Sequence, residues 1–171
     1  VAALGVGHKL ELINYFVCAG MGAAATTLVG QNLGAGNPAR AARATWRTLF
    51  LTCLPVGAVT LLLVAFPDRA VGVFNNDPAV VTAGTTYVIF AGLSQLFMAF
   101  EVVFVSAFAG AQWTMVPAVI QMGLTAARVP AAMALVALGL GVEGVWIAIA
   151  GSTVLKGAIL GVMFLVRHGR G

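Results

Sequence analysis

Long apolar segments alternate with short polar segments along this chain. No Asp, Glu, Lys or Arg occurs in residues 12–39, 48–67, 78–100 or 102–127. A helix needs about 20 apolar residues to cross the hydrocarbon core of a bilayer, and its backbone polar groups must be paired within the segment. The period-two alternation of a membrane β-barrel is absent. The pattern predicts an all-α membrane helix bundle with five transmembrane helices, at about residues 8–29, 41–66, 79–109, 114–138 and 142–166.

Composition supports the same class of protein. Residues AVILMFWYC make up 61% of the 171 residues and charged residues only 8%, whereas soluble domains carry about 25% charged residues. Neither cysteine has a Cys or His at metal-ligand spacing, and no catalytic pair is evident. Aromatic residues are not interleaved with the basic ones, as a nucleic-acid surface would require. The sequence predicts a membrane protein that is not an enzyme and has no catalytic residues, metal site, cofactor or nucleic-acid partner.

A glycine-rich segment joins the first two predicted helices. It reads Gly-Gln-Asn-Leu-Gly-Ala-Gly-Asn-Pro over residues 30–38, and the positions that define its motif are Gly30, Gln31, Gly34 and Gly36. In a soluble protein such spacing could hold a phosphate, but here both neighbouring segments are long enough to cross a bilayer. We therefore expect a tight turn at the membrane surface.

The basic residues predict an orientation in the membrane. Arg40, Arg43 and Arg47 follow the glycine-rich turn, and cytoplasmic connections carry an excess of Lys and Arg. The turn is therefore predicted to be cytoplasmic, in a multi-pass protein of the plasma (inner) membrane. Five spans then place the first residues outside and the tail, with Arg167 and Arg170, in the cytoplasm. The chain starts without Met or a signal peptide, and its outward start implies a preceding helix.

Several polar residues lie inside the predicted spans at helical spacing. Ionisable groups at membrane depth are costly and usually face a protein interior or a watery cavity. The residues that share a helix face are Tyr87, Ser94, Met98 and Glu101 with Gln95 beside them, then Glu11, Asn14, Tyr15 and Cys18, then Gln121, Thr125 and Arg128, and finally Ser152 and Lys156. Four inward polar stripes predict a bundle around a partly hydrated cavity.

Two interpretations of these charges stay open. In the first, Arg128 and Lys156 pair with acidic residues, Glu101 and Glu143, and only hold helices together. In the second, Glu101 is a lone buried carboxylate that exchanges a proton or holds a cation. Glu11 lies near the outer end of its predicted helix, where it could equally be a solvated cap.

Four segments, in order, resemble the multidrug and toxic compound extrusion (MATE) family of transporters. They are residues 8–47 with the glycine-rich turn, residues 73–80 with Asn-Asn-Asp-Pro, Arg-Val-Pro-Ala-Ala from residue 128, and Gly-Val-Glu-Gly-Val-Trp from residue 141. The turn is the most specific of them, and one departure lies at residues 111–114, Ala-Gln-Trp-Thr, where relatives usually have Gly-x-Thr. The resemblance implies that residues 1–171 are helices eight to twelve, a partial C-terminal lobe of a twelve-helix, two-lobe transporter.

The resemblance also implies a function. Family members are antiporters that expel small organic, often cationic, compounds in exchange for Na⁺ or H⁺ by alternating access. The implied partners of this piece are the N-terminal lobe, the seventh helix and the lipid bilayer. An acidic residue that binds the coupling ion on the family's tenth helix falls on Met98, and Glu101 follows one turn later on the same face.

The resulting hypothesis assigns the coupling role to Glu101. Its protonation or ion occupancy would bias helix packing, supported by Tyr87, Ser94 and Gln95, while Met98 would belong to an adaptable wall for mixed substrates.

Two other functions are consistent with the sequence. The first is a flippase of the same superfamily for lipid-linked oligosaccharides, which would need Arg and Lys in its cavity to meet phosphates. Arg128 and Lys156 are the candidates for that role. The second is a membrane scaffold subunit that transports nothing.

Overall fold

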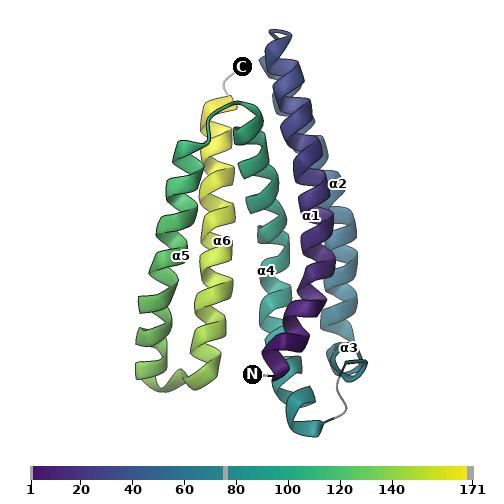
Figure 1. Ribbon diagram of the computed structural model, residues 1–171, viewed down its shortest axis with the longest axis vertical. Helices are drawn as coiled ribbons and strands as arrows, with labels where there is room; N and C mark the ends of the chain where they lie inside the picture. The colour runs from purple at the N-terminus through teal and green to yellow at the C-terminus, as the bar shows by residue number, and fades with distance from the viewer. Residues whose placement is uncertain (1, 75–76, 169–171) are drawn as a thin grey trace.

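The computed structural model describes residues 2–74 and 77–168, and nearly all of them are helical. The helices are α1 (Ala2–Gly34), α2 (Pro38–Ala65), the short α3 (Pro67–Gly72), α4 (Pro78–Gly110), α5 (Met115–Leu135), the π-helical turn η1 (Val136–Leu140) and α6 (Gly141–His168). Figure 1 shows the five long helices running roughly along one axis, with α4 in the middle. The predicted all-α helix bundle is confirmed.

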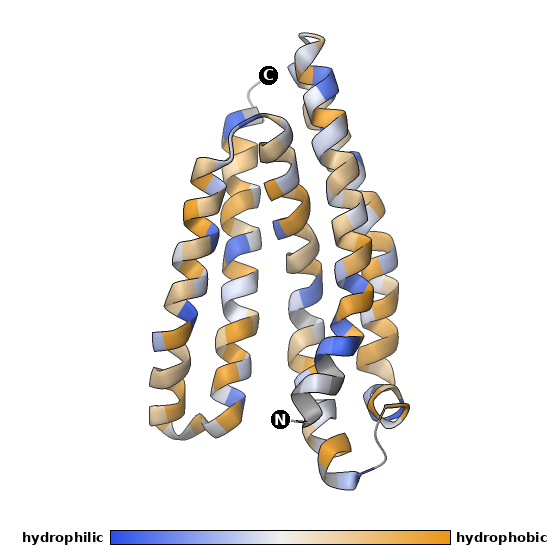
Figure 2. Ribbon diagram, in the orientation of Figure 1, coloured by the Kyte–Doolittle hydropathy of each residue, from blue (hydrophilic) through white to orange (hydrophobic). Residues whose placement is uncertain are grey.

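The long helices match the thickness of a membrane. In the described part of the chain, three stretches are long and apolar enough to cross one, His8–Gly34, Pro38–Ala65 and Met115–Arg167, and the bent α4 is a fourth when its two halves count as one span. The third stretch doubles back at Gly139, whose φ of 91° is left-handed, so α5 and α6 lie antiparallel (Figure 1). Hydrophobic residues cover most of each long helix in Figure 2. The protein is embedded in a membrane and crosses it several times.

The helices differ in extent from the sequence-based ranges. α1 begins at Ala2 instead of about residue 8, and it continues to Gly34. The sequence analysis assigned residues 67–78 to a loop, but Pro67 opens the short helix α3, where proline's fixed φ suits the first helical position. Val71 of α3 is fully buried against α1 and α4 beside Leu10 and Tyr87. Tertiary burial therefore makes a helix from a segment with many turn-forming residues.

Small residues let α1, α4 and α6 approach closely. A side chain on Gly110 would collide with the carbonyl of Thr26, and one on Gly157 would meet the Phe97 carbonyl at 2.6 Å. The Thr26 hydroxyl donates a hydrogen bond of 2.9 Å to the Ser106 carbonyl across the α1–α4 interface. Close backbone approach through small residues is the usual packing mode of membrane helices.

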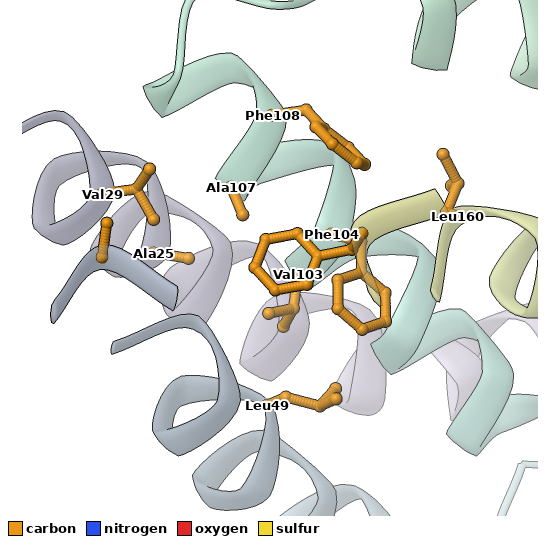
Figure 3. Packing of buried hydrophobic residues seen from close by; sticks show 10 residues of the cluster. Ala25, Val29, Leu49, Val103, Phe104, Ala107, Phe108 and Leu160 are labelled. Carbon is orange, nitrogen blue, oxygen red and sulfur yellow. The ribbon is translucent and has the colours of Figure 1, made fainter. Parts of the chain in front are cut away.

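The largest apolar core joins α4 to α1, α2 and α6. Phe104 and Phe108 of α4 are its largest fully buried side chains. Figure 3 shows them between Val29 of α1, Leu49 of α2 and Leu160 of α6. α5 packs chiefly against α6, and many of its large apolar side chains are exposed.

α4 is bent in the middle. Its halves, Val80–Gly92 and Ser94–Gly110, meet at an angle of 47°. The Ser94 hydroxyl donates to the Ala91 carbonyl at 2.8 Å. Gly and Ser near one another, together with a hydroxyl bonded back to the preceding turn, are known causes of helix bending.

The glycine-rich segment forms a tight turn between α1 and α2. The N–H of Gly36 bonds to the Leu33 carbonyl and the N–H of Asn37 to the Asn32 carbonyl, both at 2.9 Å, which is the Schellman arrangement. Gly36 has a φ of 72°, the left-handed conformation that this arrangement requires. The other motif positions belong to α1: Gly30 lies 3.4 Å from the Gly110 carbonyl by its would-be Cβ, the Gln31 carbonyl accepts the Ala35 N–H at 3.0 Å, and Gly34 is the last residue of the helix.

Candidate functional site

A groove with a polar lining runs between α1, α4, α5 and α6. Its volume is about 530 Å³, and it is lined by His8, Glu11, Leu12, Tyr15, Tyr87, Ser94, Gln95, Met98, Glu101, Val102, Arg128, Ile149, Thr153 and Lys156. We call it the polar groove. All five candidate residues of α4 line it, and so do Glu11, Tyr15 and Arg128. α4 supplies one continuous wall, because positions three, four and seven apart share a helix face.

Glu11 is the centre of a hydrogen-bond network in this groove. The Tyr87 hydroxyl donates to its Oε2 at 2.9 Å, and the Gln95 amide donates to its Oε1 at 3.3 Å. The His8 ring nitrogen Nδ1 lies 3.0 Å from the same Oε2. Tyr87 precedes the bend of α4 and Gln95 follows it, so one carboxylate of α1 connects both halves of the bent helix.

Two buried acceptor atoms lie near this network without partners. Gln95 is almost completely buried, and its Oε1 has no hydrogen-bond partner among the described residues. The same holds for Oδ1 of the fully buried Asn14, whose amide instead donates to Thr60 of α2 at 3.3 Å. An unsatisfied buried acceptor costs about 1–3 kcal/mol. Such atoms occur where a proton donor, a water or a cation binds.

Glu101 has different surroundings. Its Oε1 accepts a hydrogen bond from Lys156 at 2.9 Å and another from Gln121 at 3.2 Å. The side chains of Lys156 and Glu101 are only 9% and 12% exposed. This pair links α4 to α6, and Gln121 adds α5.

The supporting residues expected around Glu101 therefore lie elsewhere. Tyr87 and Gln95 bond to Glu11, and Ser94 bonds to the backbone of its own helix. The structure gives Glu101 a cation as its partner, as the ion-pair interpretation of the sequence expected for Lys156.

Arg128 lies in the groove without a carboxylate partner. Its Nε donates to the Ser152 hydroxyl at 2.8 Å, and it makes no ion pair in the described part of the chain. The expected partner Glu143 is exposed in the first turn of α6, where a negative charge interacts favourably with the helix dipole. Arg128 and Ser152 thus tie α5 to α6, while the guanidinium remains at the groove wall.

Sequence reasoning missed His8, which it set aside as a terminal residue. Because α1 starts earlier than expected, His8 lies inside the helix, one turn before Glu11. Its ring also packs edge-on against Tyr87 at a centroid distance of 5.9 Å. The spacing of three between His8 and Glu11 was the available signal.

The groove is balanced in charge and mixed in polarity. Two carboxylates, Glu11 and Glu101, face two permanent cations, Lys156 and Arg128. Leu12, Met98, Val102 and Ile149 add apolar surface. Such a site can exchange a proton or a small cation at a carboxylate and can also contact a partly apolar organic molecule.

Comparison with known proteins agrees with this architecture. A model of the MatE family matches residues 1–134. The probable multidrug resistance protein NorM of Thermotoga maritima is 26% identical over 162 residues, which are 94% of this chain and 35% of that protein. Multidrug and toxin extrusion protein 1 of Homo sapiens is 29% identical over 158 residues, 91% of this chain and 28% of that protein. The chain spans about a third of the length of these curated relatives. It belongs to the MatE family.

Proposed function

We propose that this chain is part of a multidrug efflux antiporter, which expels small organic, often cationic, compounds in exchange for Na⁺ or H⁺ by alternating access. Relatives named for multidrug resistance and toxin extrusion match most of the chain. One observation carries the proposal for this particular chain. Glu11 is a carboxylate in a groove between helices, has no Lys or Arg partner in the described part, and connects both halves of a bent helix.

The coupling ion is proposed to bind at Glu11. The carboxylate and the unpartnered Oε1 of Gln95 supply the oxygen ligands that a desolvated Na⁺ requires, and a proton would bind to the carboxylate itself. A protonated Glu11 gains a donor, which the Gln95 carbonyl can accept if its amide turns over. Both forms of coupling therefore use atoms already present in the groove.

Ion occupancy at Glu11 would then act on the bend of α4. Tyr87 and Gln95 lie on opposite sides of the bend and both donate to Glu11. A bound cation or proton competes with these donors and weakens the link between α1 and the two halves of α4. A change of bend angle at this place would alter the width of the groove and the affinity for substrate, which is the coupling that antiport needs.

Glu101 remains the alternative coupling residue. Its use would require Lys156 to move away, because the lysine occupies the carboxylate in this structure. Removing one partner of a buried ion pair is strongly unfavourable, so a cation would have to replace the lysine directly. Glu11 needs no such exchange, and we therefore assign the first role to it.

The remaining parts of the proposal follow from the same architecture. Met98 and Tyr15 supply soft and aromatic surface for organic substrates. The N-terminal lobe and the seventh helix of the transporter would close the groove from the opposite side. The α1–α2 turn, with its three arginines, would face the cytoplasm of the inner membrane, and the N-terminus of α1 would face outside.

The decisive experiment compares Glu11→Gln, Glu101→Gln and the exposed control Glu143→Gln in the complete gene product. Efflux of ethidium from proteoliposomes is driven first by an imposed pH gradient and then by an imposed Na⁺ gradient. We expect Glu11→Gln to lower gradient-driven efflux at least tenfold and Glu143→Gln to leave it unchanged. The gradient that drives wild-type efflux identifies the coupling ion. Normal efflux by Glu11→Gln together with loss in Glu101→Gln would transfer the coupling role to Glu101.

A lipid-linked oligosaccharide flippase is the second candidate function. The observation in its favour is that Arg128 and Lys156 both line the polar groove. Lys156 is already neutralised by Glu101, however, so the groove offers little excess positive charge to a diphosphate. Headgroup translocation measured in the same proteoliposomes separates the two functions. Translocation without ethidium efflux would establish the flippase.

A further inference from the structure

A second groove lies at the end of the bundle that holds the α1–α2 turn. It has a volume of about 560 Å³, and every residue that lines it belongs to α1 or α2: Leu28, Asn32, Arg40, Arg43, Ala44, Arg47, Thr48 and Leu51. It shares no lining residue with the polar groove. The described residues of the substrate site therefore do not account for it.

Three arginines share one face of α2 in this groove. Arg40, Arg43 and Arg47 are three and four residues apart, which places their side chains on one side of the helix. All three are exposed, and none forms an ion pair with an acidic side chain in the described ranges. The sequence explains why, because residues 12–67 contain no Asp or Glu. Nothing in α1 after Glu11 or in α2 can neutralise these charges.

The position of the arginines within the helix adds to the positive potential. Arg40 lies in the first turn of α2, which starts at Pro38, and the N-terminus of a helix carries a partial positive charge. Basic residues there are repelled by the dipole, whereas an anion would be attracted by both the dipole and the guanidinium groups. Figure 2 shows blue, hydrophilic residues at this end of the α1–α2 pair. The groove therefore favours a negatively charged ligand.

The far wall of the groove is apolar. Leu28 is 40% exposed and Leu51 is 54% exposed, and both line the groove with the arginines. At 1.5 Å per residue, Leu51 lies about 16 Å along α2 from Arg40, toward the middle of the bundle. A ligand that fills this groove would be anionic at one end and hydrocarbon at the other.

We propose that the groove between α1 and α2 is a binding site for an anionic phospholipid. The phosphate binds to Arg43 and Arg47, and an acyl chain lies along Leu28 and Leu51. The arginines stand at the end of a membrane-spanning helix, the depth at which lipid headgroups occur. A small soluble phosphate compound would use the guanidinium groups but would leave the leucines uncovered, so charge and apolar surface together select the lipid.

The test uses the complete gene product in detergent, with native mass spectrometry to measure bound lipid. The probes are palmitoyl-oleoyl phosphatidylglycerol, phosphatidylcholine with the same acyl chains, and glycerol phosphate without acyl chains. One variant is the double substitution Arg43→Gln/Arg47→Gln, and a second is the charge-preserving Arg43→Lys/Arg47→Lys. The matched control is Arg69→Gln, whose guanidinium lies over Phe66 next to α3, outside the groove. Ala44→Phe fills the groove while it keeps all three arginines.

The wild-type protein is expected to prefer phosphatidylglycerol to phosphatidylcholine. A basic residue at the membrane surface contributes about a fivefold gain in binding to anionic lipid, so the double glutamine variant should bind phosphatidylglycerol about 30-fold more weakly. The lysine variant and Arg69→Gln should retain most of the preference. Ala44→Phe should weaken phosphatidylglycerol binding but leave glycerol phosphate binding unchanged.

Three results would overturn the proposal. The first is equal binding of both lipids, as expected if another part of the protein covers the groove. The second is an equal loss of preference in the double glutamine variant and in Arg69→Gln, which would indicate only a general effect of charge. The third is displacement of phosphatidylglycerol by glycerol phosphate at a similar concentration, which would show an anion site without a role for the acyl chain.

Discussion

At the scale of single residues, the polar groove holds two carboxylates with different partners. Glu11 bonds to Tyr87, Gln95 and His8, whereas Glu101 bonds to Lys156 and Gln121. Helical spacing placed most of these residues on inward faces in advance. Spacing along one helix does not say which residue of another helix lies opposite, and for that reason the sequence could not assign Gln95 to Glu11 or Lys156 to Glu101.

Breaking the Glu101–Lys156 pair should destabilise the protein strongly. Lys156→Met leaves a nearly buried carboxylate without its cation, and we expect a loss of about 3–5 kcal/mol in the free energy of unfolding. The double variant Glu101→Leu/Lys156→Met should regain most of that loss, because it removes both charges. Thermal unfolding in detergent measures both effects, and Lys9→Met, at an exposed lysine of α1, is the control. A double variant no more stable than Lys156→Met would contradict a simple ion-pair role.

At the scale of secondary-structure elements, two tight turns are built in the same way with different residues. The turn after α4 has N–H bonds from Gln112 to Ala109 and from Trp113 to Phe108, the pattern that Gly36 and Asn37 form after α1. Gln112 has a φ of 59° and is the one non-glycine residue with a left-handed φ in the described part of the chain. A side chain in this conformation costs about 1 kcal/mol.

Gln112→Gly should therefore stabilise the protein by up to about 1 kcal/mol, since it relieves the left-handed strain at the end of α4. The matched change Gly36→Ala introduces that strain at the end of α1 and should destabilise by about 1 kcal/mol or slightly more. Denaturation midpoints of the two variants in one detergent check the opposite signs. Equal signs would show that factors other than the left-handed conformation determine stability at these turns.

The elements themselves were largely predictable, and the exceptions have physical reasons. Charge-free runs separated by Gly and Pro located the five long helices because a membrane imposes a minimum span length. The short helix α3 was missed because it depends on the burial of Val71 by α1 and α4. The bend in α4 was missed as well, since Gly92 and Ser94 occur in a segment that reads as uninterrupted apolar helix.

At the scale of the whole molecule, the two ends of the bundle differ in charge. The end with the α1–α2 turn carries Arg40, Arg43, Arg47 and Arg167, whereas the acidic residues Glu11, Asp68, Asp77 and Glu143 lie toward the other end. Figure 1 shows that the C-terminus lies near the first of these ends and the N-terminus near the second. The bundle class followed from the sequence, but the peripheral place of α5 depends on contacts between helices and could not be predicted.

The positive end is predicted to face the cytoplasm. In a background with Cys18→Ala and Cys53→Ala, the variant Ala35→Cys should react with a membrane-impermeant maleimide only after cells are permeabilised. Val73→Cys, at a side chain that is 81% exposed, should react in intact cells. Gel-shift labelling of both variants measures the orientation. The reverse labelling pattern would mean that the protein is inserted the other way.

The absence of acidic residues from 12 to 67 has a consequence for how the protein responds to its surroundings. Arginine stays protonated across the physiological pH range, so the charge of the α1–α2 hairpin beyond Glu11 is constant while the acidity of the medium changes. Ionic strength, in contrast, screens exposed charges within about 10 Å. The polar groove carries titratable carboxylates and a histidine, so acidity acts mainly on one site and salt mainly on the other. Two environmental variables can thus be varied independently in one helix bundle.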